Sequence, residues 1–355
     1  MNNNLTIFII SIILLTTLIL ILILTRPTKR ENYRKKDNDN TIFISLANYR
    51  DDDCKNTLSH IFENAKYPEN IFVGVLSQYK ENQESCELKS HPYAYNIRYM
   101  NVDESKAAGP LYARINIINN LYSGEKYFLM IDAHTRFKKD WDHIAMKQLD
   151  YLKNNGVDKP IISAYPATYD DFKNKPNRKD VPFICEIIDG DVIPKSLNAK
   201  FMKGNLFRRG YFIGAGCLFT YGKFFETIDL NPNLKHVFGG EELLFSILAY
   251  THGWDIYGFA QNFLFHHYGH GKPNWFSDNH KQKEFKQHEE KSYDFLENLL
   301  TTDNFQTKYG LGSVRKLQDF WNEIGWKHNG SDFSKNWDKN NNDLLCDNTK
   351  IIPYK

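Results

Sequence analysis

Asp132 and His134 stand one residue apart, directly after the apolar stretch 127–131. In an extended chain, residues two positions apart point to the same side, so the carboxylate and the imidazole can reach one ion. This pair of donors suits Mn²⁺, or Mg²⁺ with the histidine as a weaker ligand. A second strand-like stretch, 262–266, ends at His266, which can supply a third ligand. We therefore expect a divalent metal site at Asp132, His134 and His266.

Each of these residues also has a simpler explanation when it is taken singly. Asp132 can cap a following helix, and a single histidine is more often structural than a ligand. Two separate metal-type positions at strand ends make the metal interpretation stronger than either one alone. Because alternate strand positions face opposite ways, we expect His266, and not its neighbour His267, to be the ligand.

Three carboxylates are candidates for catalysis. Glu241 and Glu242 follow two glycines and precede an amphipathic helical stretch. One of them can hold an acceptor hydroxyl or a sugar. Consecutive helical positions lie about 100° apart, so we expect only one of the two to face a given site. The alternative is that both complement the helix dipole. Asp255 is a weaker candidate, because a role in the turn after Trp254 explains it better.

Two further segments could contact a nucleotide. Residues 109–114 begin a predicted helix, whose first amides, together with Arg114, can meet a diphosphate. Gly109 is equally consistent with an ordinary turn, and Arg114 with a surface charge. The segment from Ser45 to Asp51 has donors and acceptors that can read a base and a ribose, and its alternative is a plain polar loop.

The elements that must position these residues alternate between strands and helices. The sequence predicts strands over 41–46, 71–77, 97–102, 127–131 and 160–164, with helices over 54–65, 111–122 and 140–152. This order favours an α/β fold with a mostly parallel sheet flanked by helices, which binds its ligand at the carboxyl ends of the strands. Residues 165–209 read as irregular loops, and helices are expected again over 241–250, 285–300 and 313–324.

Composition and charge exclude several classes of protein. The 355 residues are 25% charged and 41% hydrophobic, which argues against a disordered chain. The formal net charge is +2, and segment 26–40 carries six basic and three acidic residues, so the rest has 2 − 3 = −1. We therefore expect no nucleic-acid partner. Five scattered cysteines without a CxxC pair suggest neither a disulfide framework nor a zinc ribbon.

The amino terminus reads as a membrane anchor. Residues 5–24 contain no charge and would span about 30 Å as a helix, the thickness of the hydrocarbon core. We expect a tail over 1–4, a single-pass anchor in the lipid bilayer over 5–25 and a basic linker over 26–40. The six Lys/Arg after the span favour a cytosolic catalytic domain. A glycosylation sequon at Asn329 favours a lumenal one. Of the two sides, the charges lead us to expect the cytosolic face.

Taken in order, these segments resemble the GlcNAc-transferase family typified by the Skp1-hydroxyproline enzyme. The resemblance is carried by residues 42–78, 109–142, 214–259, 263–268 and 309–321, so it covers most of 41–325. The chain is similar, more distantly, to polypeptide GalNAc-transferases, which share a strand end of the Asp-x-His type and a Gly-Gly-Glu helix start. The family often has Asp-Ser-His, whereas this chain has Ala133 in the middle position.

The resemblance implies a retaining, UDP-sugar-dependent enzyme of the glycosyltransferase A-type, Rossmann-like fold. It implies that Asp132, His134 and His266 bind the metal and that Glu241 or Glu242 holds the sugar or the acceptor. It also implies a set of residues that hold UDP: Ser45, Tyr49, Arg50, Asp51, Gln78, Gly109, Arg114 and Asp132.

The sequence thus predicts a catalytic domain over 41–327 and a polar tail over 328–355. The expected activity is metal-dependent transfer of GlcNAc, or a related sugar, from a UDP-sugar to a hydroxyl of a protein or glycan. The alternative is a membrane-anchored, catalytically inactive protein of the same fold that binds sugar nucleotides or carbohydrate.

Overall fold

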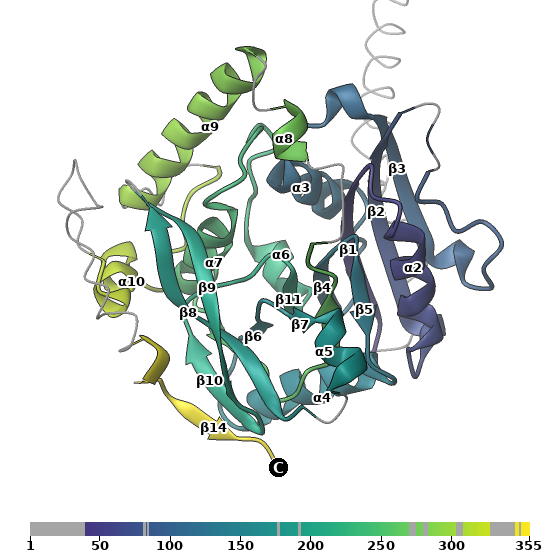
Figure 1. Cartoon of the computed structure of the whole chain (residues 1–355). Helices are drawn as coiled ribbons and strands as arrows, with labels where there is room; N and C mark the ends of the chain where they lie inside the picture. The colour runs from purple at the N-terminus through teal and green to yellow at the C-terminus, as the bar shows by residue number, and fades with distance from the viewer. Residues whose placement is uncertain are drawn as a thin grey trace, which may run out of the picture. The chain divides into compact units, whose positions relative to one another are not determined.

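Figure 1 shows the computed structural model of the chain. It describes residues 40–80, 83, 85–175, 178–190, 193–269, 275–279, 283–302, 308–326, 345–347 and 349–355. The predicted anchor over 5–25, nearly all of the linker and the sequon at Asn329 lie outside these residues. Within the described part, none of the helices combines the length and the apolar character needed to cross a membrane.

A large mixed sheet forms the centre of the unit Asn38–Lys355. Its nine strands in the described part run in the order β14-β10-β12-β6-β11-β4-β1-β2-β3. Four neighbours at one end are parallel and begin where the apolar stretches predicted them: β1 (Ile42–Tyr49), β2 (Ile71–Tyr79), β3 (Ile97–Asp103) and β4 (Tyr127–Asp132).

The other half of the sheet is largely antiparallel, which corrects the prediction of a mostly parallel sheet. β6 (Pro160–Ser163) and β12 (Asp255–Tyr257) are parallel to each other. β11 (Cys217–Tyr221) is antiparallel to both β4 and β6, and β10 (Leu206–Gly210) is antiparallel to β12. The strand–helix alternation that builds parallel sheets stops near residue 164, so the later strands are not bound to one direction.

Helices cover both faces of the sheet because its strands alternate between two hydrophobic clusters. One cluster contains Ile42 and Ile44 with residues of α2 (Cys54–Glu63) and α4 (Trp141–Asn154). The other contains Phe43 with residues of α3 (Pro110–Asn120) and α7 (Glu241–Thr251). Figure 1 shows α2 and α3 on opposite sides of β1 and β2. Alternate side chains of β1 therefore pack into the hydrophobic core on one face of the sheet and into the core on the other face.

Residues 165–209 are more regular than predicted. They form β7 (Ala167–Thr168), α5 (Tyr169–Asn174), β8 (Asp180–Gly190), β9 (Pro194–Lys203) and β10. β8 and β9 pair as an antiparallel ribbon with several register shifts. Those irregularities, and the polar residues along β9, hide the alternating pattern by which a strand is recognised.

A small sheet joins three distant segments next to the end of β4. β13 (Leu264–His266) lies between β5 (Thr135–Phe137), which it pairs in antiparallel fashion, and β7, to which it is parallel. His266 is opposite Thr135, so the predicted metal residues from two parts of the chain are brought to one place.

Four further α-helices complete the described part of the chain. They are α6 (Lys223–Thr227), α8 (Trp275–Asn279), α9 (Lys283–Thr301) and α10 (Leu317–Ile324). The predicted polar tail also contains structure, since β14 (Ile351–Pro353) pairs with β10 and extends the sheet at its edge (Figure 1).

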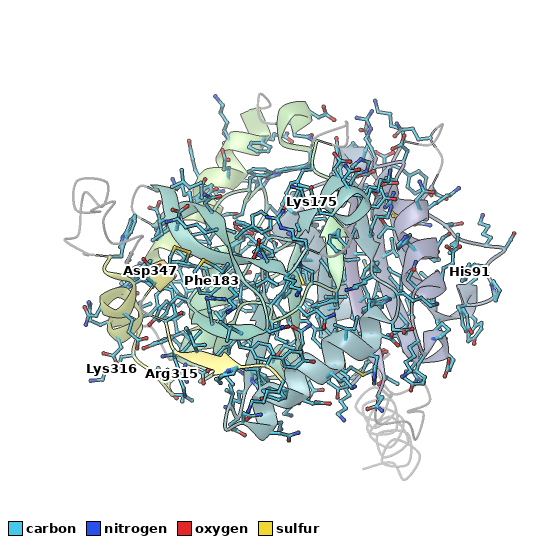
Figure 2. The ribbon with its side chains drawn as sticks, turned by 60° about the horizontal axis from the view of Figure 1, so that its bottom comes forward. His91, Lys175, Phe183, Arg315, Lys316 and Asp347 are labelled. Atoms are coloured by element: carbon cyan, nitrogen blue, oxygen red, sulfur yellow. A yellow bond between two sulfur atoms is a disulfide. The ribbon has the colours of Figure 1, made fainter. Side chains whose placement is uncertain are left out.

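Four of the five cysteines form disulfides, contrary to the sequence-based interpretation. Cys54 at the start of α2 pairs with Cys86, and Cys185 in β8 pairs with Cys346 in the tail. The second bond lies near the labelled Phe183 and Asp347 in Figure 2. Cys217 is buried and free. The partners are separated by 32 and 161 residues, so spacing along the chain could not reveal them.

Candidate active site

Asp132, His134 and His266 meet at the carboxyl end of β4. One ligand atom from each lies within 4.8 Å of the others. Asp132 Oδ2 is 3.1 Å from His266 Nε2, and the two imidazole rings are 4.5 Å apart between centroids. One carboxylate and two imidazoles form a donor set that suits Mn²⁺ or another divalent transition metal. The residues predicted from spacing therefore fit a metal ion where the structure places them.

Neighbouring groups orient this cluster. His134 Nδ1 lies 2.6 Å from Asp51 Oδ2, which leaves Nε2 as the atom for a ligand. A carboxylate on the second nitrogen is the usual way in which proteins fix a metal-binding histidine. Gly216 is needed on the other side, because a Cβ there would lie 3.1 Å from Asp132 Oδ2. Asp51 was predicted to hold the nucleotide, and the structure gives it this orienting contact as well.

Ionisation in the cluster follows from its hydrogen bonds and charges. Burial alone would raise the pKa of Asp132, but the hydrogen bond with His266 and the charge of Arg114 hold that pKa far below its usual range. Burial would lower the pKa of His134, but its contact with Asp51 and the charge of Asp132 raise it. Asp132 is therefore ionised at every physiological pH, as a metal ligand must be.

His267 is not part of the cluster. Its Nδ1 lies 3.6 Å from Asp53 Oδ2 and its ring packs near Tyr169. The strand alternation that favoured His266 over His267 therefore matches the placement of both rings.

Arg114 is enclosed between two carboxylates. Its guanidinium donates to Glu241 and to Asp132, in each case over 2.6 Å. Arg114 and Glu241 are only 4% and 3% exposed. Burial would lower the pKa of Arg114, but the charges of Glu241 and Asp132 outweigh it and raise that pKa. The guanidinium thus holds two acidic side chains in place, and it also lines the larger cavity, so its contact with the diphosphate stays a prediction.

Glu241 and Glu242 both line the same cavity, which corrects the expectation that only one could. Glu242 accepts a hydrogen bond from the Ala215 N–H over 2.8 Å and another from the Tyr165 hydroxyl. The two side chains leave the first turn of α7, whose amino end faces the cavity, so they reach it from either side of the helix axis. The preceding Gly240 has a φ of +85°, which favours glycine there.

Two cavities meet at Asp132. The larger, about 790 Å³, is lined by Arg114, Glu241, Glu242, His266, Tyr165 and Tyr268, among others. The smaller, about 200 Å³, is lined by Tyr49, Asp51, Gln78, Gly109, His134 and Trp275, among others. Asp132, Pro110 and Phe238 line both. The predicted nucleotide residues Tyr49, Asp51, Gln78 and Gly109 are therefore brought together, next to the metal cluster.

Three predicted residues line neither of these cavities. Ser45 is fully buried within β1. Arg50 is paired with Asp278 and Glu104 at 3.1 and 3.2 Å. Asp255 accepts from Arg315 over 2.9 Å and lines neither cavity, so its place does not support a catalytic role.

Sequence reasoning missed the aromatic residues of the larger cavity. Tyr165 follows β6 and contacts Glu242. Tyr268 follows β13, the strand that ends at His266, and its hydroxyl donates to the Pro166 carbonyl over 3.0 Å. Phe238 and Tyr268 are 54% and 49% exposed, unusual for large hydrophobic side chains. The sequence gives one indication of these two residues: Phe238 directly precedes Gly239–Gly240, and Tyr268 lies two residues after His266.

Burial gives Glu242 an unusual pKa and makes the stability of the fold depend on pH. Desolvation raises that pKa to about 7, although the hydrogen bonds from Tyr165 and Ala215 oppose it. Between pH 4.5 and 7 the folded chain binds a proton at Glu242 that the unfolded chain releases, so this residue's contribution to stability falls as pH rises. At 1.36 kcal/mol for each pKa unit, the loss is about 3 kcal/mol.

We therefore expect Glu242→Gln to remove this loss. The free energy of unfolding of the unmodified chain should fall by about 3 kcal/mol more than that of the variant between pH 4.5 and pH 8. Urea unfolding with EDTA at each pH measures both curves, and EDTA keeps metal binding out of the comparison. Parallel curves would show that Glu242 titrates near its ordinary value.

One family model matches most of the chain. The model of the family described as glycosyltransferase (GlcNAc) matches residues 41–94 and 89–329. No curated protein matches the chain. Among solved structures, TarS 1–349 of S. aureus is 12% identical with a TM-score of 0.42, over 64% of this chain and 60% of that one.

Two further solved structures are similar. TarS 1–349 in complex with UDP-GlcNAc is 10% identical with a TM-score of 0.43, over 70% of this chain and 64% of that one. GalNAc-T7 with UDP, GalNAc and Mn²⁺ is 12% identical with a TM-score of 0.46, over 80% of this chain and 54% of that one. The present chain thus spans less than two thirds of each of these three chains.

Proposed function

The chain belongs to the glycosyltransferase (GlcNAc) family, and we propose that it transfers GlcNAc from UDP-GlcNAc to a hydroxyl group. We propose further that the reaction is metal-dependent and retaining and takes place on a glycosyltransferase A-type fold. The observation that carries this proposal is the Asp132–His134–His266 cluster on the wall between two cavities. The smaller cavity suits the nucleotide and the larger one suits the sugar and the acceptor.

The cluster would hold a divalent ion, Mn²⁺ or Mg²⁺, beside the donor's diphosphate. Such an ion supplies electrostatic stabilisation of the leaving group. The solved structures of GalNAc-T7 with UDP, GalNAc and Mn²⁺ and of TarS with UDP-GlcNAc are consistent with this choice of ligands.

Glu241 and Glu242 line the larger cavity, where we place the reacting sugar, yet neither is suited to act as a nucleophile. Glu241 is held by Arg114, and the raised pKa of Glu242 leaves much of it protonated near neutral pH. We therefore favour attack by the acceptor on the face from which UDP departs. The bond from the anomeric carbon to the diphosphate oxygen breaks, the bond to the acceptor oxygen forms, and the acceptor's proton passes to the departing diphosphate.

Exposed aromatic rings support an acceptor that presents sugar or other apolar faces. Tyr268 lies with its ring centroid 4.1 Å from that of His266, and its hydroxyl is fixed by the Pro166 carbonyl. Phe238 lines both cavities. Exposed aromatic rings that line a cavity offer an apolar surface for stacking. A glycan hydroxyl is the acceptor that this arrangement favours, and a protein hydroxyl is the alternative.

Release of UDP tests the proposal. The full chain, purified in detergent, should release UDP from UDP-GlcNAc with Mn²⁺ and should stop when EDTA is added. A panel of other UDP-sugars tests donor identity. Failure to turn over any donor, with UDP-GlcNAc binding retained and independent of metal, would instead identify a carbohydrate-binding protein that has lost catalysis.

The two disulfides support an oxidising compartment for the catalytic domain. Disulfides persist in secreted and lumenal proteins and are rare in the cytosol, whereas the basic residues after 5–25 favour the cytosolic side. A single-pass anchor with a lumenal catalytic domain reconciles the bonds Cys54–Cys86 and Cys185–Cys346 with the sequon at Asn329. Protease treatment of sealed microsomes decides this: a protected fragment supports the lumenal side, and digestion without detergent supports the cytosolic side.

A further inference from the structure

A third cavity, of about 290 Å³, lies beside β13, the strand that ends at His266, and has four basic side chains in its lining. Lys138, Lys175, Arg178 and Lys179 line it, together with Asp171 and Asn262. Four cations against one carboxylate give it a net charge of 4 − 1 = +3, more than the +2 of the whole chain. The total charge therefore concealed a local concentration of positive charge.

The cations come from two segments that are distant in the sequence. Lys138 follows β5, whereas the others belong to the segment that connects α5 to β8. Figure 2 labels Lys175 at the end of α5. Like charges gathered at one place repel each other, and a bound anion would reduce that repulsion.

The carboxylate in this cavity offsets only part of the charge. Asp171 contacts Arg178 over 2.7 Å and Lys175 over 3.3 Å. No carboxylate among the described residues is within ion-pair distance of Lys138 or Lys179. Two ammonium groups thus remain for an anionic ligand.

One cation is held in place. The Arg178 guanidinium lies 3.5 Å from the centroid of the Phe201 ring in β9 and is also bound by Asp171. A guanidinium fixed in this way can present its remaining donors in a defined direction, which suits recognition of an oxyanion.

A buried acceptor in the same cavity also lacks a partner. Asn262 is only 7% exposed, and its Nδ2 donates to the Asp180 carbonyl over 3.0 Å, which fixes the orientation of the amide. Its Oδ1 has no hydrogen-bond partner within the described part of the chain. Buried acceptors are normally satisfied, and a ligand hydroxyl would satisfy this one.

We propose that this basic cavity binds a small phosphate ester that also carries hydroxyl groups, such as a phosphorylated sugar or the head group of a phosphorylated lipid. The phosphate would contact the lysines and Arg178, and a hydroxyl would donate to Asn262. The volume of about 290 Å³ is just below the roughly 300–1,000 Å³ typical of sites for drug-sized molecules, which suits a small ligand.

This site is separate from the one that holds the donor. Phe265 lines the basic cavity, and the next residue, His266, belongs to the metal cluster. Neighbouring residues in a strand face opposite ways, so the two sites lie on opposite sides of β13. The proposal does not depend on the transferase activity.

Calorimetric titration of the full chain tests the site. The probes are glucose 6-phosphate, inorganic phosphate and vesicles of phosphatidylcholine with or without a phosphoinositide. The variant is Lys138→Gln/Lys179→Gln, and its matched control is Lys223→Gln/Lys316→Gln, which removes the same charge from exposed lysines elsewhere. Figure 2 shows Lys316 well apart from Lys175.

The first variant should bind at least about tenfold more weakly, because it loses two charge-assisted contacts, while the control should not change. Loss of glucose 6-phosphate binding would identify a soluble ester as the ligand, and loss of phosphoinositide binding alone would identify a lipid. Binding that EDTA leaves intact supports a site apart from the metal cluster. Equal affinity of the variant and its control for every probe, or no binding by the unmodified chain, would overturn the proposal.

Discussion

Replacing Asp132 with alanine is expected to abolish Mn²⁺ binding and to reduce transfer from UDP-GlcNAc at least about 1,000-fold, since a bound metal contributes several kcal/mol to stabilising the transition state. Asp132 is the one carboxylate in the cluster and lines both cavities. Its loss leaves Arg114 still paired with Glu241, so the fold should survive. Calorimetry with Mn²⁺, UDP-release assays and urea unfolding measure the three effects.

The neighbouring histidines provide a matched pair of controls. His266→Ala should also lose Mn²⁺ binding, because Nε2 faces Asp132. His267→Ala should bind Mn²⁺ as the unmodified chain does, because its ring contacts Asp53 and Tyr169 instead. If His267→Ala were the more damaging of the two, the third ligand would be assigned one residue too early.

The strands and helices that depend on local sequence patterns could be predicted from the sequence. Apolar stretches such as 71–77 and 127–131 became β2 and β4, because fully buried strands read as continuous apolar runs. Asp132 and His134 could be found because they follow such a strand. The β8–β9 ribbon was missed, since it has register shifts and a polar outer face, so no regular alternation marks it.

The contacts between distant residues could not be predicted. Nothing in the spacing of Cys185 and Cys346 indicates that they meet, and nothing near Arg114 shows that it would be buried between Glu241 and Asp132. Pairing of this kind depends on how helices pack over the sheet, which a helical or strand period does not encode. The basic cavity was concealed for the same reason, because Lys138 and Arg178 are distant in sequence.

Arg114 has the largest expected effect on stability. In Arg114→Met, Glu241 would be left as a buried carboxylate without its partner, and breaking a buried ion pair in this way costs about 3–5 kcal/mol. Glu241→Gln should cost less, about 1–3 kcal/mol, because the guanidinium keeps Asp132 as a partner and the amide oxygen can still accept. Urea unfolding measures both changes in the free energy of unfolding.

The double variant distinguishes the free-energy cost of an unpaired buried charge from the cost of lost packing. Arg114→Met/Glu241→Gln leaves no unpaired charge between α3 and α7, so it should be more stable than Arg114→Met alone, with a coupling of about 0.5–3 kcal/mol. Arg209→Met is the matched control, because Arg209 is 28% exposed and only loosely paired with Asp255 and Glu323, so it should cost no more than about 1 kcal/mol. If adding Glu241→Gln brought no recovery, the cost of Arg114→Met would come from packing, and Arg114 would not serve to neutralise the buried carboxylate that faces the larger cavity.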